Sequence, residues 1–159
     1  MKIKTDLSPN FSSKTRLKRS IKFIIIHYTG MQSEIESINR LKNIKAKVSC
    51  HYLINRKGLI IQMVKDNKIA WHAGKSKWGN DKNLNLNSIG IELVNKGDEK
   101  FPFLQIKNLC MLIKYIKKKH KIQKKHVLGH SHIAPGRKID PGIHFPWKKL
   151  ANQNLSNNH

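Results

Sequence analysis

The segment Phe23-Ile24-Ile25-Ile26 constrains the possible folds of this chain more than any other stretch of the sequence. An unbroken run of β-branched and aromatic residues is typical of a strand that is buried on both faces. Such a strand lies in the interior of a sheet that helices flank. The run ends at His27, so we expect a rigid strand to present an imidazole at its end, where a metal ligand can be held accurately. Taken alone, this position favours a strand-end histidine bonded to backbone.

A helix is predicted after this strand. Ser33 and Glu36 have the spacing of a capping box, in which each side chain bonds to the backbone of the other residue. Apolar residues then recur at helical spacing, at Ile35, Ile38, Leu41 and Ile44. We expect this helix to pack one face on the sheet and to take no part in the chemistry.

Two further segments are expected to extend the sheet. Cys50–Asn55 and Leu59–Val64 indicate a hairpin, with Gly58 at the turn position that needs a positive φ. Ser88–Val94 alternates between apolar residues and small or polar ones, which predicts a strand with Glu92 on the face opposite its isoleucines. Together these elements predict an α+β (mixed α/β) fold with a central, mixed, mostly buried sheet flanked by helices.

A long helix and the chain length complete the predicted organisation. Phe103–His120 carries an apolar stripe at helical spacing. The chain has 159 residues, which suffices for one domain and is short for two. We expect this domain at residues 21–150, a loosely held basic arm at residues 1–20 and a disordered tail at residues 151–159.

The stretch Val127–Trp147 reads VLGHSHIAPGRKIDPGIHFPW and has the densest set of chemically active residues. A short strand-like approach leads into an irregular loop that prolines and glycines hold. His130 and Asp140 lie ten residues apart in this stretch, a separation that a loop can close on itself. Imidazole and carboxylate are both good zinc ligands, and His27 is the best candidate for a third.

Five sequence blocks occur in an order that resembles a known enzyme family. They are FIIIHYTG, CHYLINRKGLIIQMV, AWHAGKSKWG, NSIGIELVN and GHSHIAPGRKIDPG. In this order they resemble the zinc-dependent N-acetylmuramoyl-L-alanine amidases, a family that includes phage lysozyme-type amidases and is related to peptidoglycan recognition proteins. The resemblance covers residues 21–150, and HIAPGRKIDPG is its most specific element.

The resemblance implies a zinc hydrolase that cleaves the amide bond between N-acetylmuramic acid, or its 1,6-anhydro form, and L-alanine. It implies one zinc ion per chain, held by His27, His130 and Asp140 with one position left for water. It implies Glu92 as the general base for that water and Lys138 as the donor to the developing oxyanion. Alternation alone would instead make Glu92 an ion-paired residue on a solvated face.

Two positions depart from the family pattern. Cys50 stands where phage lysozyme-type amidases have a catalytic tyrosine, which favours the branch that uses Glu92 instead. His132 stands where the family usually has aspartate, two residues after the second ligand, so the hydrogen bonding of that loop is in doubt. His51, next to Cys50, is interpreted as structural.

Three residues are candidates for substrate contacts, each with a structural alternative. Trp71 and His72 share a loop that is either a packed turn or a wall of the substrate groove, in which His72 would bond a glycan or peptide group. Arg137 either pairs with a stem-peptide carboxylate through its planar fork or bonds backbone carbonyls near its own loop. The sequence leaves both alternatives open.

The charge of the chain is strongly positive, because 32 Lys and Arg oppose 9 Asp and Glu, for a net of +23. This excess favours polyanionic surroundings, although lysine-rich coding bias explains it equally well. No nucleic-acid-binding motif supports a specific nucleic-acid partner. The family resemblance implies peptidoglycan or muropeptides as partners of a monomeric enzyme or, alternatively, of a non-catalytic peptidoglycan-binding module.

The sequence shows neither a signal peptide nor a membrane-spanning segment, and its two cysteines are far apart. Residues 1–20 contain no apolar run of signal-peptide length, and no segment is long enough to span a membrane. The default expectation is the cytoplasm, and the alternative is a periplasmic or wall-associated location reached by a non-classical route. Cys50 and Cys110 do not make a disulfide framework, and Cys110 fits a buried position in its helix.

Overall fold

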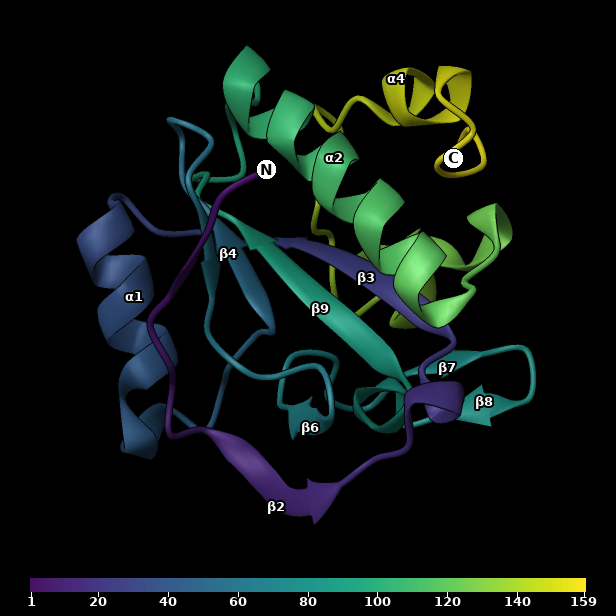
Figure 1. Cartoon of the computed structure of the whole chain (residues 1–159). Helices are drawn as coiled ribbons and strands as arrows, with labels where there is room; N and C mark the ends of the chain where they lie inside the picture. Colours follow the sequence, from purple (N-terminus) through teal and green to yellow (C-terminus); the bar gives the residue numbers. More distant parts are fainter.

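The computed structural model describes all residues from Met1 to His159. Its main feature is a six-stranded sheet with the strand order β1-β5-β4-β9-β3-β10. Figure 1 shows its central strands β4, β9 and β3 side by side. These strands are β1 (Ile3–Thr5), β3 (Phe23–Tyr28), β4 (Tyr52–Ile54), β5 (Ile60–Gln62), β9 (Ser88–Leu93) and β10 (Val127–Gly129). The β4–β5 pair is antiparallel and the other pairs are parallel, which confirms the predicted mixed sheet.

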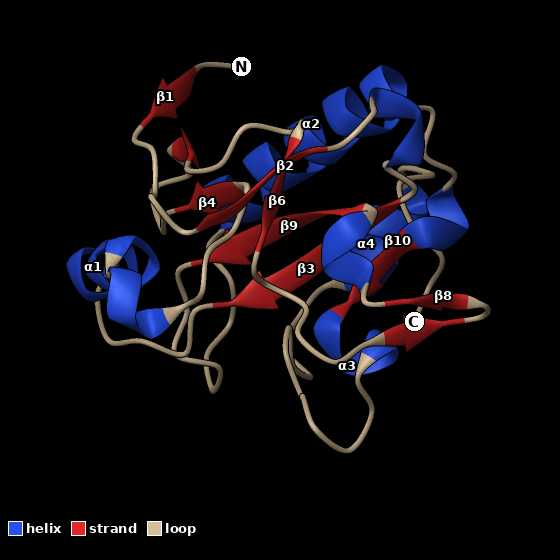
Figure 2. Ribbon diagram, turned by 90° about the horizontal axis from the view of Figure 1, so that it is seen from below, coloured by secondary structure: helices blue, strands red, loops and turns tan.

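Smaller elements surround this sheet (Figure 2). Two two-stranded ribbons consist of β2 (Phe11–Thr15) with β6 (Lys68–Ala70) and of β7 (Lys77–Trp78) with β8 (Asp81–Lys82). The α-helices are α1 (Glu34–Lys42), α2 (Phe103–His120), α3 (His130–Ile133) and α4 (Trp147–Asn152). Short 3-10 turns lie at Lys18–Ser20, Ile44–Ala46, Leu84–Leu86 and Lys124–His126.

The predicted interior strand is β3, which pairs with β9 on one side and with β10 on the other. Alternate side chains of a strand point to opposite faces. Ile24 and Ile26 therefore belong to the main core on one face, while Phe23 and Ile25 belong to a smaller core on the other. All four side chains are at most 2% exposed, as expected for a strand buried on both faces.

One face of the sheet is covered by α2, whose bounds are those predicted from its apolar stripe. Figure 1 shows this helix lying across β3 and β9. The stripe enters the main core at Ile106, Leu109, Cys110, Leu112, Ile113 and Ile116. Burying one such aliphatic side chain contributes about 1.5–3 kcal/mol, so this interface is a major source of stability.

The predicted capping box at the start of α1 is confirmed. The Ser33 hydroxyl accepts a hydrogen bond from the Glu36 N–H at 3.1 Å, and the Glu36 carboxylate accepts one from the Ser33 N–H at 3.3 Å. This pair satisfies backbone donors that the first turn of a helix leaves free.

The predicted apolar face of α1 is only partly correct. Leu41 is buried in a small cluster with residues of β4 and β5, and Ile38 packs against that cluster. Ile35 is 72% exposed and Ile44 is 70% exposed, contrary to the prediction. Ile44 lies beyond the end of the helix at Lys42, so helical spacing no longer determines where its side chain points.

The hairpin of β4 and β5 is confirmed, with Gly58 in its turn at a φ of +84°. A Cβ atom at Gly58 would lie 2.8 Å from the carbonyl oxygen of Leu104. The turn therefore requires glycine both for its conformation and for its close approach to α2.

The prediction that residues 1–20 form a loosely held arm is wrong. β1 pairs with β5 at the edge of the main sheet, and β2 pairs with β6. Ser8, Asn10 and Arg16 are buried, and the Arg16 guanidinium donates to the Asp66 carbonyl oxygen at 2.9 Å. Backbone pairing and buried polar side chains hold this segment, and neither leaves a hydrophobic period in the sequence.

The prediction of a disordered tail at residues 151–159 is also wrong. The chain leaves α4 and packs against α2, where Leu155 joins the main core and Ser156 is buried. The Lys117 ammonium donates to the carbonyl oxygens of Asn154 and Leu155 at 2.8 and 3.2 Å.

Among the helices of the fold, none combines the length and the apolar character that crossing a membrane requires.

Candidate metal centre and catalytic cleft

His27, His130 and Asp140 converge at one edge of the central sheet. The Nδ1 atoms of the two histidines are 3.0 Å apart, and Asp140 Oδ2 lies 2.9 Å from His27 Nδ1 and 3.1 Å from His130 Nδ1. All three residues are buried, and their ligand atoms lie within 4.8 Å of one another. The structure therefore brings together the three predicted ligands in a set that could hold one metal ion.

The register of three parallel strands produces this convergence. His27 is paired with Glu92 of β9, and Ile26 is paired with Gly129 of β10. His130 follows Gly129 directly, as His27 follows Ile26. The two histidines therefore lie at the same height along the parallel strands. The carboxyl ends of parallel strands meet at one edge of a sheet, which is where α/β folds commonly bind ligands.

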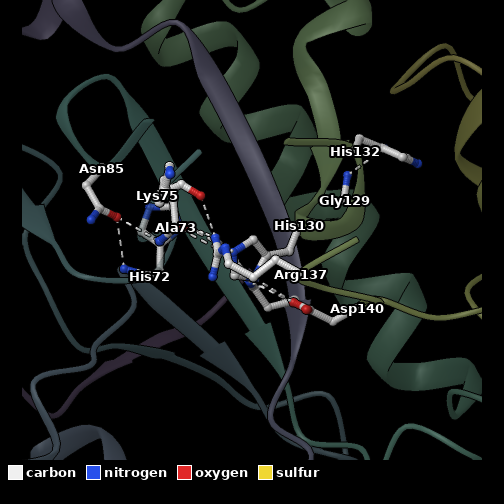
Figure 3. A network of polar contacts seen from close by, with 10 residues as sticks. His72, Ala73, Lys75, Asn85, Gly129, His130, His132, Arg137 and Asp140 are labelled. Carbon is white, nitrogen blue, oxygen red and sulfur yellow. Dashed lines mark hydrogen bonds and ion pairs between the residues drawn. The ribbon is translucent and has the colours of Figure 1, made fainter. Parts of the chain in front are cut away.

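The loop after α3 returns Asp140 to the two histidines. The Ser131 N–H donates to the Asp140 carbonyl oxygen at 2.9 Å and closes the loop at its base. His132 Nδ1 accepts from the Gly129 N–H at 3.0 Å, and the His132 ring lies beside Trp147, apart from the ligands (Figure 3). The His132 side chain thus supplies an acceptor for a backbone N–H, as an aspartate side chain could.

The local environment favours the protonation states that a metal requires. Burial lowers the pKa of His27 to about 4, so its imidazole is neutral at pH 7. Burial alone would raise the pKa of Asp140, but the close contacts with the His130 and His27 rings outweigh it and hold that pKa below its usual value. Metals bind neutral imidazole and ionised carboxylate.

The His130 ring is oriented by a backbone carbonyl. His130 Nε2 lies 3.0 Å from the carbonyl oxygen of Ala73. A carbonyl oxygen can only accept, so Nε2 carries the hydrogen and Nδ1 directs its lone pair at the centre. The His130 Nδ1 lone pair faces Asp140 Oδ2 at 3.1 Å. This arrangement fits a cation bound by both atoms.

Glu92 borders the centre from β9, on the same face as its strand partner His27. Its Oε2 atom is buried and has no hydrogen-bond partner. Burial raises the pKa of Glu92 well above its usual value, and the nearby Asp140 raises it further. A buried carboxylate oxygen without a partner costs free energy, so the position indicates a function and contradicts the alternative of an ion pair on a solvated face.

A cavity of about 550 Å³ opens over the centre. Besides the three ligands, its walls include Tyr28, Trp71, Glu92, Arg137, Lys138 and Ile139. This size is suited to a small ligand or to part of a larger one. Both predicted catalytic residues, Glu92 and Lys138, therefore face the space in which a substrate would meet the metal centre.

The predicted substrate-binding residues have different outcomes. Trp71 is half-buried in the cavity wall. The Arg137 Nη2 group donates to the carbonyl oxygens of Ala73 and Lys75 at 2.8 and 2.7 Å, which is the backbone alternative (Figure 3). Arg137 also borders the cavity, so a contact from the rest of its guanidinium to a substrate stays a prediction.

His72 borders the cavity, but its ring does not have the predicted role. Its Nδ1 lies 3.0 Å from His27 Nε2, and its Nε2 lies 3.0 Å from the Ser88 hydroxyl. Both ring nitrogens therefore have protein partners, which contradicts the expectation that His72 bonds a glycan or peptide group. His51 is buried, and its Nδ1 accepts from the Gly90 N–H at 3.0 Å, as expected for a structural histidine.

Two residues around His72 were missed by the sequence prediction. Asn85 Oδ1 accepts from the N–H groups of His72 and Ala73 at 3.0 and 2.8 Å (Figure 3), and Ser88 contacts the His72 ring. The sequence has one signal for this arrangement, which is Gly90. A Cβ atom there would overlap the His72 ring, so the glycine makes room for it.

Comparison with known families agrees with this geometry. The model of a family described as N-acetylmuramoyl-L-alanine amidase matches residues 17–143, which include the three candidate ligands as well as Glu92 and Lys138. The chain belongs to the N-acetylmuramoyl-L-alanine amidase family. This confirms the family that the sequence blocks indicated.

Curated members of the amidase family show the same similarity. The chain is 40% identical over 151 residues to the N-acetylmuramoyl-L-alanine amidase AmiD of Escherichia coli K12, covering 85% of this chain and 54% of AmiD. It is 42% identical over 104 residues to the 1,6-anhydro-N-acetylmuramyl-L-alanine amidase AmpD of Haemophilus influenzae, covering 65% of this chain and 56% of AmpD. The chain thus spans about half the length of these curated relatives.

Solved structures of amidases have the same fold. A complex of Escherichia coli AmiD with the substrate anhydro-N-acetylmuramic acid-L-Ala-D-γ-Glu-L-Lys matches 91% of this chain and 61% of that chain, with a TM-score of 0.81 and 36% identity. A selenomethionine AmpD structure matches 97% of this chain and 94% of that chain, with a TM-score of 0.84 and 26% identity. These matches confirm the predicted mixed α/β amidase fold.

Proposed function

We propose that this chain is a zinc hydrolase that cleaves the amide bond between N-acetylmuramic acid, or its 1,6-anhydro form, and L-alanine. The observation that carries this proposal is the convergence of His27, His130 and Asp140 beside the unpartnered carboxylate of Glu92, under one cavity. The names of AmiD and AmpD support the substrate class.

The donor set fits zinc. Two neutral imidazoles and one carboxylate are ligands that catalytic zinc sites use, and His27, His130 and Asp140 would hold one ion per chain. When bound, zinc would act as a Lewis acid that polarises the amide carbonyl, and it would bring the pKa of bound water towards about 7.

Glu92 is the residue placed to move the proton. Amide hydrolysis requires that the attacking water lose a proton and that the leaving nitrogen gain one. The Glu92 carboxylate lies beside the ligands in a buried site, and its raised pKa makes it a stronger base than an exposed glutamate. It would accept the proton from water and deliver it to the nitrogen of L-alanine as the C–N bond breaks.

Lys138 and the cavity wall serve the substrate. Lys138 borders the same cavity as Glu92 and Asp140, so its ammonium can stabilise the negative charge that develops on the carbonyl oxygen. One such donor contributes about 3–4 kcal/mol in a pre-organised site. Trp71 would form a wall for the glycan or peptide, and Arg137 would offer its remaining donors to a stem-peptide carboxylate.

The test is the release of stem peptides from purified sacculi, measured in parallel with anhydro-muropeptides. We expect release that a chelator abolishes and that added zinc restores. The ratio of the two rates defines the preferred substrate. Binding to sacculi without any peptide release would contradict the proposal and would support the alternative of a non-catalytic peptidoglycan-binding module.

Two further measurements test the expected composition of the enzyme. Elemental analysis of the purified protein should give one zinc ion per chain. Light scattering should give the mass of a monomer, which is 18.4 kDa. A zinc ratio near one half or a dimer mass would contradict these two expectations separately.

A further inference from the structure

We propose that the two-residue segment His72-Ala73 is the positioning element that orients both imidazole ligands of the metal centre. This inference rests on the metal site of the proposed function. It assigns a role to His72, Ser88 and Asn85, which contact the ligands or hold the segment but face no reacting atom.

The direction of the hydrogen bonds at His72 begins at Ser88. The Ser88 hydroxyl lies 2.5 Å from the carbonyl oxygen of Leu84, and a carbonyl can only accept, so the hydroxyl hydrogen is used there. The Ser88 oxygen is then the acceptor for His72 Nε2 at 3.0 Å. The hydrogen of the neutral His72 ring is therefore on Nε2.

This assignment fixes the ring of His27. Since His72 Nδ1 carries no hydrogen, it accepts from the Nε2–H group of His27 at 3.0 Å. His27 Nδ1 is then without a hydrogen and directs its lone pair toward His130 and Asp140. The chain of donors from His27 through His72 and Ser88 to Leu84 permits one tautomer at each ring.

The neighbouring residue does the same for the second imidazole. The Ala73 carbonyl oxygen accepts from His130 Nε2, which leaves His130 Nδ1 free for the metal. One short segment thus leaves a lone pair on both metal-facing Nδ1 atoms. The His72 side chain does this for His27, and the Ala73 carbonyl does it for His130.

Two side chains hold this segment, and a glycine leaves room for it. Asn85 Oδ1 accepts from the backbone N–H groups of both His72 and Ala73 (Figure 3). Arg137 donates to the same Ala73 carbonyl oxygen at 2.8 Å. The absence of a side chain at Gly90 lets the His72 ring lie against β9. These contacts fix where the two acceptors stand before any metal binds.

The first test compares two serines that are matched in their contacts. Ser88 donates to a main-chain carbonyl and accepts from a ring N–H; Ser8 is buried, donates to the Leu41 carbonyl at 2.6 Å and accepts from the Asn10 N–H at 3.1 Å, in another part of the fold. Zinc affinity is measured by competition with a chromophoric chelator. We expect Ser88→Ala to bind zinc about 10- to 100-fold more weakly than the wild type and Ser8→Ala to bind it with unchanged affinity.

The second test uses His72 itself. His72→Gln keeps a side-chain acceptor for His27, whereas His72→Leu removes it. We expect the leucine variant to bind zinc at least 10-fold more weakly than the glutamine variant. Nitrogen NMR of the zinc-bound wild type should show hydrogens on the Nε2 atoms of His27, His72 and His130, and Ser88→Ala should lose the protected His72 signal.

The outcomes separate this inference from the proposed function. A wild-type chain that binds no zinc overturns both. A wild type that binds zinc, together with a Ser88→Ala variant whose affinity equals that of Ser8→Ala, overturns the positioning role alone. If the His72 variants do not fold, the comparison of the two serines decides the matter.

Discussion

His27 and Glu92 are directly paired residues of the parallel strands β3 and β9. His27 is a candidate ligand of the metal centre, and Glu92 carries the buried, unpartnered carboxylate oxygen beside it. Their relative position is set by the backbone register of two interior strands and does not depend on a flexible loop. The spacing between the candidate metal centre and Glu92 is therefore set by the sheet itself.

The replacement Glu92→Gln tests the proton-transfer role. Glutamine keeps the size of the side chain but cannot take a proton, so we expect peptide release to fall about 100- to 10,000-fold while zinc content and fold are retained. Release rates, elemental analysis and circular dichroism check the three parts. A variant with wild-type turnover would show that the base is another group.

The replacement His130→Ala tests ligation, and His132→Ala is its matched control. Both histidines lie in α3, but only His130 faces Asp140. We expect His130→Ala to lose most of its zinc and His132→Ala to keep one ion per chain. Equal zinc content in the two variants would contradict the assignment of His130.

The replacement Gly90→Ala tests how closely the His72 ring approaches β9. The new methyl group would overlap the ring, so either the ring or the strand must move. We expect a loss of about 1–3 kcal/mol in the free energy of unfolding, measured in denaturant, and weaker zinc binding. A variant with wild-type stability and zinc affinity would show that the ring has room to shift at no cost.

Acid stability should depend on Asp66, which does not line the cavity over the metal centre. Burial alone would raise its pKa, but hydrogen bonds from His120, Lys119 and Tyr52 outweigh it and hold the pKa below its usual value. A carboxyl with a lower pKa in the folded state adds stability at pH values above its unfolded pKa of about 3.9. That contribution is lost as the pH falls from about 4 towards the folded pKa.

The variant Asp66→Asn isolates this contribution. We expect it to lower the free energy of unfolding at pH 7 by about 1–3 kcal/mol, because the charge-assisted bonds are lost. The difference from the wild type should shrink at pH 3 and below. Denaturant unfolding at both pH values measures it, and a difference that is constant across pH would assign the effect to packing.

The sequence was sufficient for elements with a strong hydrophobic pattern. The run before His27 is continuously apolar, and the apolar residues of α2 recur at helical spacing, so both elements were predicted where they are found. His130 and Asp140 were predicted as ligands from their shared motif and His27 from the end of the buried run, and the family resemblance joined the three. Each of these signals lies in neighbouring residues of the sequence.

The contacts of residues 1–20 and of His72 could not be predicted in this way. β1 and β2 are held by backbone hydrogen bonds, which any side chain permits. The His72 ring contacts His27 through Nδ1 and Ser88 through Nε2. The proposed positioning role of His72 depends on which of these two nitrogens carries the hydrogen. That choice depends on a carbonyl oxygen that the fold brings into place, and no spacing in the sequence encodes it.

The edge position of β1 has a practical consequence for work with isolated fragments. The family match starts at residue 17, so a fragment cut at that boundary would lack both N-terminal strands. The outer side of β5 would then offer free N–H and C=O groups, which recruit strands from other molecules. Self-association of such a truncated protein would be a product of the cloning boundary and would not report the oligomeric state of the 159-residue chain.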